Sequence, residues 1–522
     1  MERQDRKMFS KNPIIWSDYP DLDIIRVEDT YYMISTTMHF MPGGAILKSY
    51  DLIHWEMESY VYETLDNTPG QCLEENKSIY GKGMWAASLR YHKGSFYVCF
   101  VANDTGKTYL YTARDIKGPW SKQYIEGFYH DCSLLFDEDD RVYILYGNKT
   151  LYLTELNEEL TAPKEGGLHR ILATDTGKVN LGYEGAHLYK INGRYYVFLI
   201  HWPAEGTKRR TECCLMSDSL EGEFTGRDIL DDDMGYHNAG VAQGGIVDTP
   251  EGEWYGMLFQ DHGAIGRIPV LVPVHWEQDF PVFGVDGKVP LKIEVPSTRP
   301  EYRYKPLADS DDFKYLPEED GKIHLKKVWQ FNHTPDNSLW SVTEEPEAYR
   351  IRTGKLSPNV LLAVNTLTQR LMGPVSETSV TVCGSGLKDG DFAGICVLQG
   401  CYGYIALTKE KENYYLVMTG KELTRDESIW GPEGGDKNPG REYERIPING
   451  SQVTLKIISN FENNKDEADF YYLRGQEWCR LGITQKLHFR LDHFTGARVG
   501  LFCYSTRFTG GTADFRQFTF HC

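Results

Sequence analysis

The segment NGRYYVFL, residues 192–199, shows the pattern that decides the fold. A polar turn leads into an aromatic residue, a tyrosine and an apolar run, which is typical of a β-strand that follows a tight turn. The pattern occurs four more times in the first 300 residues, as EDTYYMIS (28–35), KGSFYVCF (93–100), DDRVYILY (139–146) and EGEWYGML (251–258). Short strand-like runs dominate this region, and helical periodicity is hard to find.

The five copies share one aligned tyrosine position. The tyrosines lie 65, 46, 53 and 59 residues apart, at Tyr32, Tyr97, Tyr143, Tyr196 and Tyr255. A repeat of this length can hold a four-stranded sheet, and loose repeats of such sheets are typical of β-propellers. We therefore predict that residues 1–300 form a five-bladed β-propeller.

The repeat also aligns five side chains upstream of these tyrosines. A step of 11 residues back from the first tyrosine, and of 12 from each of the others, reaches Asp21, Trp85, Asp131, Glu184 and Gln243. The innermost strand of each blade lines the central axis, so a shared phase predicts one ring of side chains around one cavity. A ring of hydrogen-bonded structural groups is the alternative interpretation.

Three carboxylates in such a ring indicate a reaction. Two carboxylates across a cavity can cleave a glycosidic bond, because one protonates the departing oxygen while the other activates water or attacks carbon. A third carboxylate beside the acid repels negative charge there and keeps the proton in place until it is needed. This would explain why Asp131 interrupts the apolar stretch GFYHDCSLLF (127–136).

Taken singly, these residues have ordinary structural explanations. Asp21 follows a proline and can belong to a turn, and Glu184 can be a loop glutamate. Arg267 stands among apolar residues, where it can bind a sugar hydroxyl, pair with a carboxylate or tie two blades together. The histidines are interpreted as structural groups rather than ligands: His39, His130, His187, His237 and His262.

The composition narrows the class of partner. A net charge of −19 disfavours nucleic acid and anionic membranes, so a neutral oligosaccharide is the expected partner. No apolar run approaches the roughly 18 residues that cross a bilayer, and the start lacks the apolar segment of a secretory signal. Eleven scattered cysteines without a C-x-x-C pair indicate free thiols and a cytoplasmic location. The oligomeric state is left open.

Four blocks of the sequence resemble glycoside hydrolase family 43, the inverting β-xylosidases and α-L-arabinofuranosidases. They are NPIIWSDYPDLDIIRVEDTYYMISTT (12–37), GKGMWAASLRYHKGSFYV (81–98), HDCSLLFDEDDRVYILYG (130–147) and GYEGAHLYKINGRYYV (182–197). The resemblance implies that Asp21 is the general base and Glu184 the general acid. It also implies that Asp131 orients and tunes the acid and that Trp85 lines the sugar pocket.

The resemblance extends to other parts of the pocket. The block FQDHGAIGRIPVLVPVHWEQDFPVFG (259–284) looks like the close of the propeller and places Arg267 at the substrate-contacting arginine. Many members carry a histidine, sometimes beside a central calcium, where this chain has Gln243. No cofactor is required, and calcium at the propeller axis is a candidate only. Phe40 and Tyr183 are further candidate pocket walls.

A second domain follows the propeller. Residues 296–314 are predicted to be a linker, and residues 315–522 contain alternating strands such as SVTVCG (379–384) and QVTLKII (452–458). Segments such as DGDFAGICVL (389–398) resemble the concanavalin-like β-sandwich that accompanies the family. The predicted fold is therefore all-β, a five-bladed propeller followed by a sandwich.

Together these features predict an exo-acting inverting hydrolase that releases terminal xylose, arabinofuranose or both from xylan- or arabinan-derived oligosaccharides. Two alternatives stay open at this point. The propeller can bind sugar without catalysis, or an open groove can make the protein an endo-arabinanase.

Overall fold

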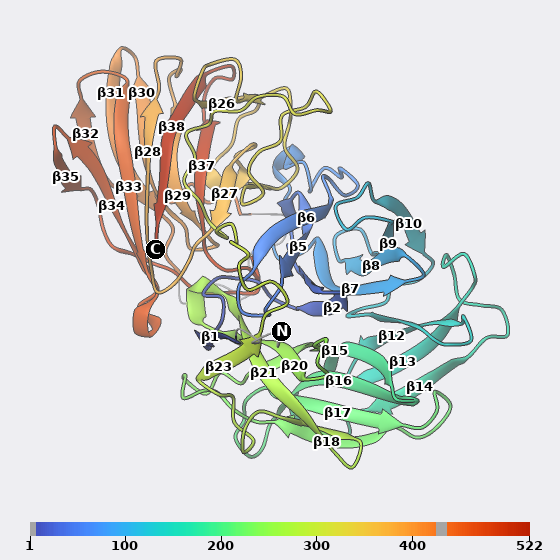
Figure 1. Cartoon of the computed structure of the whole chain (residues 1–522). Helices are drawn as coiled ribbons and strands as arrows, with labels where there is room; N and C mark the ends of the chain where they lie inside the picture. The colour runs from blue at the N-terminus through green and yellow to red at the C-terminus, as the bar shows by residue number, and fades with distance from the viewer. Residues whose placement is uncertain (1–6, 424–435) are drawn as a thin grey trace.

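The computed structural model describes residues 7–423 and 436–522 and is built almost entirely from strands (Figure 1). Four short 3₁₀ helices interrupt them, at Glu74–Asn76, Gly263–Ile265, Val360–Leu362 and Glu462–Asn464. Within these ranges no helix is long and apolar enough to cross a membrane. The predicted all-β architecture of a propeller and a sandwich is confirmed.

Each propeller blade is a four-stranded antiparallel sheet made of strands that are close in sequence. The first three blades are β2 (Asp23–Val27), β3 (Thr30–Ser35), β5 (Gly43–Ser49) and β6 (Glu56–Tyr62); β7 (Met84–His92), β8 (Ser95–Ala102), β9 (Lys107–Ala113) and β10 (Ser121–Ile125); and β11 (Ser133–Phe136), β12 (Val142–Asn148), β13 (Thr150–Leu156) and β14 (His169–Thr174). The last two blades are β15 (Val179–Ile191), β16 (Arg194–Pro203), β17 (Thr211–Ser217) and β18 (Thr225–Leu230), then β19 (Ala242–Asp248), β20 (Trp254–Asp261), β21 (Arg267–Glu277) and β22 (Phe280–Phe283).

The repeated tyrosines explain why the blades share one design. All five lie on the second strand of a blade, namely β3, β8, β12, β16 and β20. The apolar residues around them pack between neighbouring blades: Ile34 and Ile46 of the first blade, for example, share a cluster with Leu89 and Val98 of the second. Burial of alternate strand residues between twisted sheets is the main stabilising term in such an architecture.

Two eight-stranded sheets form the sandwich. The first, in spatial order, is β32 (Arg441–Ile448), β31 (Asn413–Gly420), β30 (Gly403–Glu410), β29 (Asp391–Leu398), β37 (Arg498–Ser505), β27 (Leu367–Arg370), β24 (Gln330–Asn332) and β4 (Phe40–Met41). The second contains β25 (Trp340–Ser341), β26 (Tyr349–Arg352), β38 (Thr512–His521), β28 (Val375–Cys383), β33 (Gln452–Asn460), β34 (Glu467–Arg474) and β35 (Glu477–Arg480), and β36 (Gln485–Lys486) pairs with β34.

The two domains share a sheet. Strand β4 belongs to the propeller segment of the chain, yet it pairs with β24 of the sandwich, with Phe40 opposite Asn332 and Met41 opposite Phe331. Figure 1 shows the sandwich, in orange and red, packed beside the blue first blade. The domains therefore meet through backbone hydrogen bonds as well as side chains, which fixes their relative position more firmly than surface contact alone.

The chain between the domains is also tied down. Strand β23 (Lys292–Pro296) pairs with β1 (Lys7–Lys11), and the following segment runs along the first blade. There the Tyr302 hydroxyl donates to Glu56 at 2.5 Å, and the Arg299 guanidinium bonds Asp29 at 2.8 Å. The segment predicted as a linker is thus held against the propeller by aromatic and charged side chains.

Candidate active site

The five residues of the predicted ring all lie where the innermost strand of a blade begins. Asp21 and Asp131 come two residues before β2 and β11, and Trp85, Glu184 and Gln243 lie within the first residues of β7, β15 and β19. Each of these three strands has an irregular register at this point. Such departures from the strand ladder are a common way to re-aim a side chain next to an active site.

Three of the five adopt a backbone conformation that side chains rarely tolerate. Their φ angles are positive: 53° at Asp21, 48° at Asp131 and 63° at Gln243. Such strain persists only where surrounding structure enforces it, and it is concentrated at functional sites. For Asp21 the enforcing contacts are visible, because the preceding Pro20 carbonyl accepts hydrogen bonds from Ser35 Oγ at 2.8 Å and the Thr36 amide at 3.2 Å.

Asp21 is a buried carboxylate with a paired charge. One of its oxygens, Oδ1, accepts from Arg267 Nη1 at 2.8 Å and from Gln243 Nε2 at 3.3 Å. Burial raises the pKa of Asp21, and the Arg267 cation opposes that rise. Arg267 favours the ionised form of this carboxylate, which is the form that accepts a proton. Burial keeps the group from being a strong acid.

Asp131, His130 and Glu184 form a second charged group, with one ligand atom from each within 4.8 Å of the others. His130 Nε2 lies 3.7 Å from Asp131 Oδ2 and 3.9 Å from Glu184 Oε2. The pKa of Asp131 is raised to about 6, because burial and the charge of Glu184 raise it by more than His130 lowers it. Burial disfavours the His130 cation, but the two carboxylates outweigh it and raise the pKa of His130 to about 9.

Glu184 is the most exposed of the three carboxylates. Its side chain is 19% exposed, against 8% for both Asp21 and Asp131. The Asn148 side-chain amide donates to its Oε2 atom. The next residue is Gly185, with φ of 61°, and a Cβ there would lie 2.6 Å from the Gln243 side chain. A glycine is therefore needed for Gln243 to pass Glu184 and reach Asp21.

A phenylalanine from the sandwich lies against Trp85 and Arg267 and forms one side of the candidate site. Phe494 lies in the loop before β37, and its ring centroid is 5.7 Å from that of Trp85 and 4.4 Å from the Arg267 guanidinium carbon. Arg267 Nη2 also donates to the Phe494 carbonyl at 3.3 Å. The Asp18 carboxylate fixes this arrangement by accepting from the Arg267 amide and from Gly496 of the same loop, both at 2.8 Å.

The remaining predicted pocket residues lie outside this group. Tyr183 is half-buried beside His201, with ring centroids 5.2 Å apart. Phe40 is 1% exposed in the interdomain strand β4, with the Arg498 guanidinium 3.5 Å from its ring centroid. The ring of Phe40 is buried between the domains, so it is not part of the proposed pocket.

A buried polar cluster around Asp23, called here the Asp23 plug, joins the innermost strands of neighbouring blades. Asp23 accepts from Arg90 Nη1 at 2.6 Å, bonds His187 Nδ1 at 3.1 Å and accepts from the Ile24 and Leu89 amides at 3.1 and 2.8 Å. Burial alone would raise the pKa of Asp23, but Arg90 and His187 outweigh it and lower it to about 2. A carboxylate already surrounded by donors and a guanidinium fits calcium poorly, because this ion needs several free oxygen ligands.

Three residues near the site carry no role in the sequence-based prediction. His130 is interpreted there as structural, although its position beside Asp131 is a signal in favour of a role. Asn148 ends the apolar run of the third repeat, which is a weak signal. Phe494 gives no signal, because nothing in the sequence places a loop of the second domain at the propeller axis.

A propeller in which a charge-paired aspartate, a second acidic group and aromatic side chains meet near the starts of the innermost strands has the layout of a glycoside hydrolase. Comparison of the chain with known proteins agrees with this class of enzyme. The chain belongs to glycosyl hydrolases family 43, whose model matches residues 10–281. The model of the β-xylosidase C-terminal concanavalin A-like domain matches residues 310–521.

Individual relatives cover most of the chain. A β-xylosidase of Formosa agariphila is 29% identical over 98% of this chain and 90% of its own length. A non-reducing end α-L-arabinofuranosidase of Bacteroides ovatus is 27% identical over 66% of this chain and 64% of its own. Among solved structures, a bifunctional GH43-CE protein of Bacteroides eggerthii is 40% identical, with a TM-score of 0.89 over 99% of this chain and 64% of that one.

A second solved structure belongs to a relative with two activities. It is a GH43 glycoside hydrolase engineered to display both endo-xylanase and exo-arabinofuranosidase activity, 29% identical to this chain. Its TM-score is 0.87, and the match covers 98% of this chain and all of that one.

Proposed function

We propose that the protein is an exo-acting, inverting hydrolase that releases terminal xylose, arabinofuranose or both from xylan- or arabinan-derived oligosaccharides. The observation that carries the proposal is the difference in setting between two carboxylates. Asp21 is buried and paired with Arg267, whereas Glu184 is more exposed and bonded to Asn148. A general base that activates water belongs deep in a pocket, and a general acid belongs where the departing group leaves.

In the proposed reaction Asp21 accepts a proton from water, and that water attacks the anomeric carbon. Glu184 donates its proton to the departing glycosidic oxygen as the bond breaks. Inversion needs room for the water, with the two carboxyl groups about 6.5–9.5 Å apart. Asp131 repels negative charge on Glu184, and the His130 cation between them limits this repulsion and holds both side chains in place. No step involves a metal.

The sugar itself would lie between aromatic and polar walls. Trp85 offers a face for the sugar ring, and Arg267 and Gln243 offer donors for its hydroxyls. Xylopyranose and arabinofuranose can present similar hydroxyl geometry to one pocket. The relatives named as a β-xylosidase and as an arabinofuranosidase support both sugars, so dual activity is part of the proposal.

Exo action is supported by the sandwich loop. Phe494 stands against Trp85 and Arg267, so one side of the axial opening is a wall rather than an open groove. The engineered relative with endo-xylanase activity indicates that changes near the site can open this architecture to internal bonds. Defined oligosaccharides distinguish the two modes, because exo action on xylotetraose releases xylose and xylotriose first.

The acid assignment has a sharp test. Glu184→Ala should lower turnover of xylobiose far more than turnover of 4-nitrophenyl β-D-xyloside, because nitrophenolate departs with little need for a proton. Asp21→Ala should lower both by about 10²-fold or more, since its role as general base is needed for either leaving group. Equal losses in Glu184→Ala, with an unchanged melting temperature, would show that the acid is misplaced.

Two further readouts complete the test. Proton NMR of the first product formed from a β-xyloside should show the α-anomer, because a single displacement inverts the configuration. Sugar binding without hydrolysis of any pentoside would instead support the alternative of a non-catalytic propeller.

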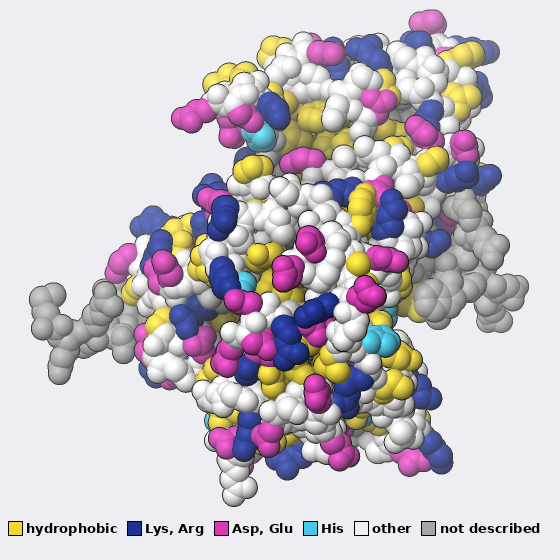
Figure 2. Space-filling view, turned by 90° about the vertical axis from the view of Figure 1, so that its right-hand side faces the viewer, with side chains coloured by type: hydrophobic (Ala, Val, Ile, Leu, Met, Phe, Trp, Pro, Cys, Tyr) yellow, Lys and Arg dark blue, Asp and Glu magenta, His cyan; other side chains and the backbone are white. Residues whose placement is uncertain are grey.

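The cysteines and the surface charge support a cell compartment and a class of substrate. None of the eleven cysteines forms a disulfide bond in the structure, which supports a reducing compartment such as the cytoplasm. Figure 2 shows acidic and basic side chains interspersed over the face that it draws, which suits a neutral substrate rather than a polyanion.

A further inference from the structure

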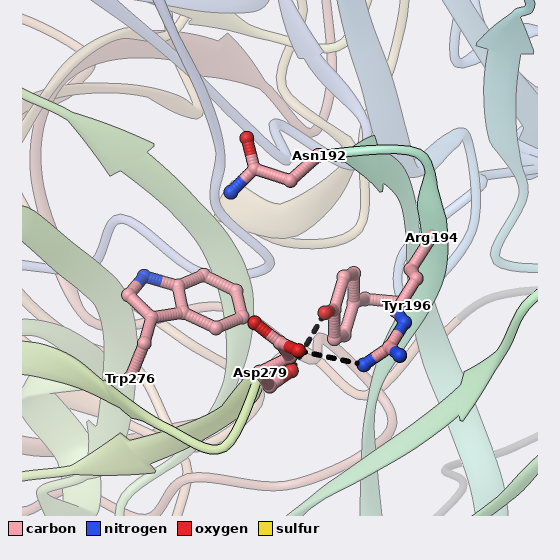
Figure 3. A pocket seen from close by; sticks show the side chains of 5 residues that line it. All are labelled: Asn192, Arg194, Tyr196, Trp276 and Asp279. Carbon is pink, nitrogen blue, oxygen red and sulfur yellow. Dashed lines mark hydrogen bonds and ion pairs between the residues drawn. The ribbon is translucent and has the colours of Figure 1, made fainter.

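A separate hollow lies on the propeller between the fourth and fifth blades. Its volume is about 220 Å³, and it is lined by Asn192, Arg194, Tyr196, Trp276 and Asp279 (Figure 3). Small-molecule pockets usually begin at about 300 Å³, so this hollow suits something of the size of one sugar ring. None of these residues takes part in the proposed reaction.

The hollow is far from the catalytic group. Strand β21 starts at Arg267, which bonds Asp21, and Trp276 is its last residue but one, nine positions further along. At about 3.3 Å per residue the two are roughly 30 Å apart. Similarly, β15 carries Glu184 near its start, and Asn192 follows its end. The hollow therefore opens on the propeller face opposite the catalytic opening.

Trp276 is held as a fixed aromatic wall. Its ring meets Tyr196 edge to face at 5.2 Å and Trp254 edge to face at 5.6 Å. Tyr196 is itself fixed, because its hydroxyl donates to the Asp279 carbonyl at 2.6 Å. Trp276 remains half-buried, so part of the indole faces solvent. A rigid, partly exposed indole is a surface on which the C–H face of a sugar can stack at low entropic cost.

Polar groups around the indole complement sugar hydroxyls. Arg194 Nη1 lies 3.0 Å from Asp279 Oδ2, and Figure 3 shows Asp279 between Trp276 and Arg194, with Asn192 above. Among the described residues, none is hydrogen-bonded to the Asn192 side chain. Hydroxyls both donate and accept, and here an amide and a carboxylate offer both kinds of partner. Because Asp218 also pairs with Arg194 at 2.9 Å, the guanidinium is neutralised and an anion is disfavoured.

We propose that this hollow is a second, non-catalytic site that binds a xylopyranose unit of a xylan-derived chain and retains the enzyme on that chain. The choice of xylan rests on the proposed function, whereas the capacity to bind a neutral sugar rests on the hollow itself. Because the two sites face opposite directions, the bound unit would not be fed directly into the catalytic pocket. Its effect is to raise the local concentration of chain ends.

Two variants test the site. Trp276→Ala removes the indole, and Asn192→Gly removes the amide while keeping the positive φ of 50° that this turn requires. The control is Trp478→Ala, which removes an indole that is 38% exposed on the sandwich. Electrophoretic retardation in gels that contain soluble arabinoxylan gives the apparent affinity, and dextran gels give the background.

We expect the wild type and Trp478→Ala to be retarded by arabinoxylan. The apparent Kd should rise at least fivefold in Trp276→Ala and at least twofold in Asn192→Gly. The kcat/KM for 4-nitrophenyl pentosides should stay within twofold in both variants. Unchanged retardation in Trp276→Ala, or no retardation of the wild type by arabinoxylan, would overturn the inference. Loss of retardation in Trp478→Ala alone would move the site to the sandwich and overturn it too.

The experiments distinguish failure of the proposed function from failure of the second site. If the protein hydrolyses no pentoside but Trp276-dependent retardation persists, the second site stands and the proposed reaction falls. Retardation by linear arabinan alone would overturn the choice of a xylopyranose ligand.

Discussion

At the scale of single residues, Arg267 determines how Asp21 can act. Burial pushes the pKa of Asp21 upward, and the guanidinium 2.8 Å away pushes it downward. A general base works when ionised, so the activity it supports is lost as the pH falls through its pKa. With Asp21 as the proposed base, the balance between burial and Arg267 is expected to set the acidic limb of the pH profile.

Replacement of Arg267 by methionine should shift that limb. Without the cation the pKa of Asp21 rises further, so the acidic limb of kcat/KM should move to higher pH. Arg267→Lys, which keeps a positive charge, is the matched control and should move it less. A lower kcat/KM with an unmoved limb would show that Arg267 contacts the sugar without tuning the base.

Asp131 should affect the alkaline limb of the pH profile. In Asp131→Asn the negative charge beside the proposed acid is lost, so the tuning role that we propose for Asp131 predicts that the alkaline limb of the xylobiose profile moves to lower pH. The pKa of His130 should fall as well, because Asp131 is the largest of the effects that raise it to about 9. NMR titration of the histidine follows that change. Asp139→Asn, at a half-exposed acid, is the control, and an unmoved alkaline limb would remove the tuning role.

At the scale of elements, the starts of the innermost strands are joined below the site by the Asp23 plug. Arg90 on β7 contacts Asp23 on β2, and its Nη2 donates to Ser133 of β11 at 2.7 Å. His187 on β15 contacts the same aspartate. Four blades thus share one buried network, which fixes the relative positions of the strands that carry the catalytic candidates.

The plug makes a prediction about stability. Asp23→Asn leaves Arg90 buried without its counter-charge, which should cost about 3–5 kcal/mol in the free energy of unfolding at pH 7. In the wild type the ionisation of Asp23 should contribute part of this stability, which is present above about pH 4 and lost as the pH falls toward 2, since the pKa of Asp23 is lowered from 3.8 to about 2. Urea unfolding across this pH range measures both.

A double variant provides the control for the plug. Asp23→Asn combined with Arg90→Met removes both charges and should be less destabilised than the sum of the single variants. Full additivity would show that the two side chains do not stabilise each other.

At the scale of the whole molecule, the sandwich is part of the active-site architecture. It extends its own sheet with β4, and its Arg370 side chain donates to the Asp18 carbonyl at 2.8 Å, three residues before Asp21. Its loop supplies Phe494. The segment that carries Asp21 is therefore positioned by two domains, and the propeller alone would lack Phe494 beside Trp85 and Arg267.

Phe494→Ala should reveal that contribution. Loss of the wall should lower kcat/KM on xylobiose by about tenfold, which corresponds to about 1.4 kcal/mol. The melting temperature should change little, because the loop is also held by Gly496 and Asp18. Phe508→Ala, at an exposed phenylalanine of the same domain, is the control. Equal activity of both variants would contradict a role for the sandwich in the pocket.

The sequence alone determined the blade design and the ring of five residues. Turn residues followed by aromatic strands act locally, and five repeats in one phase place Asp21, Asp131 and Glu184 at equivalent points of equivalent blades. Only the tertiary structure decided which groups pair across blades and domains. Arg267 meets Asp21 across 246 residues and Phe494 across 227. Such contacts depend on how sheets pack in space, and no local pattern records them.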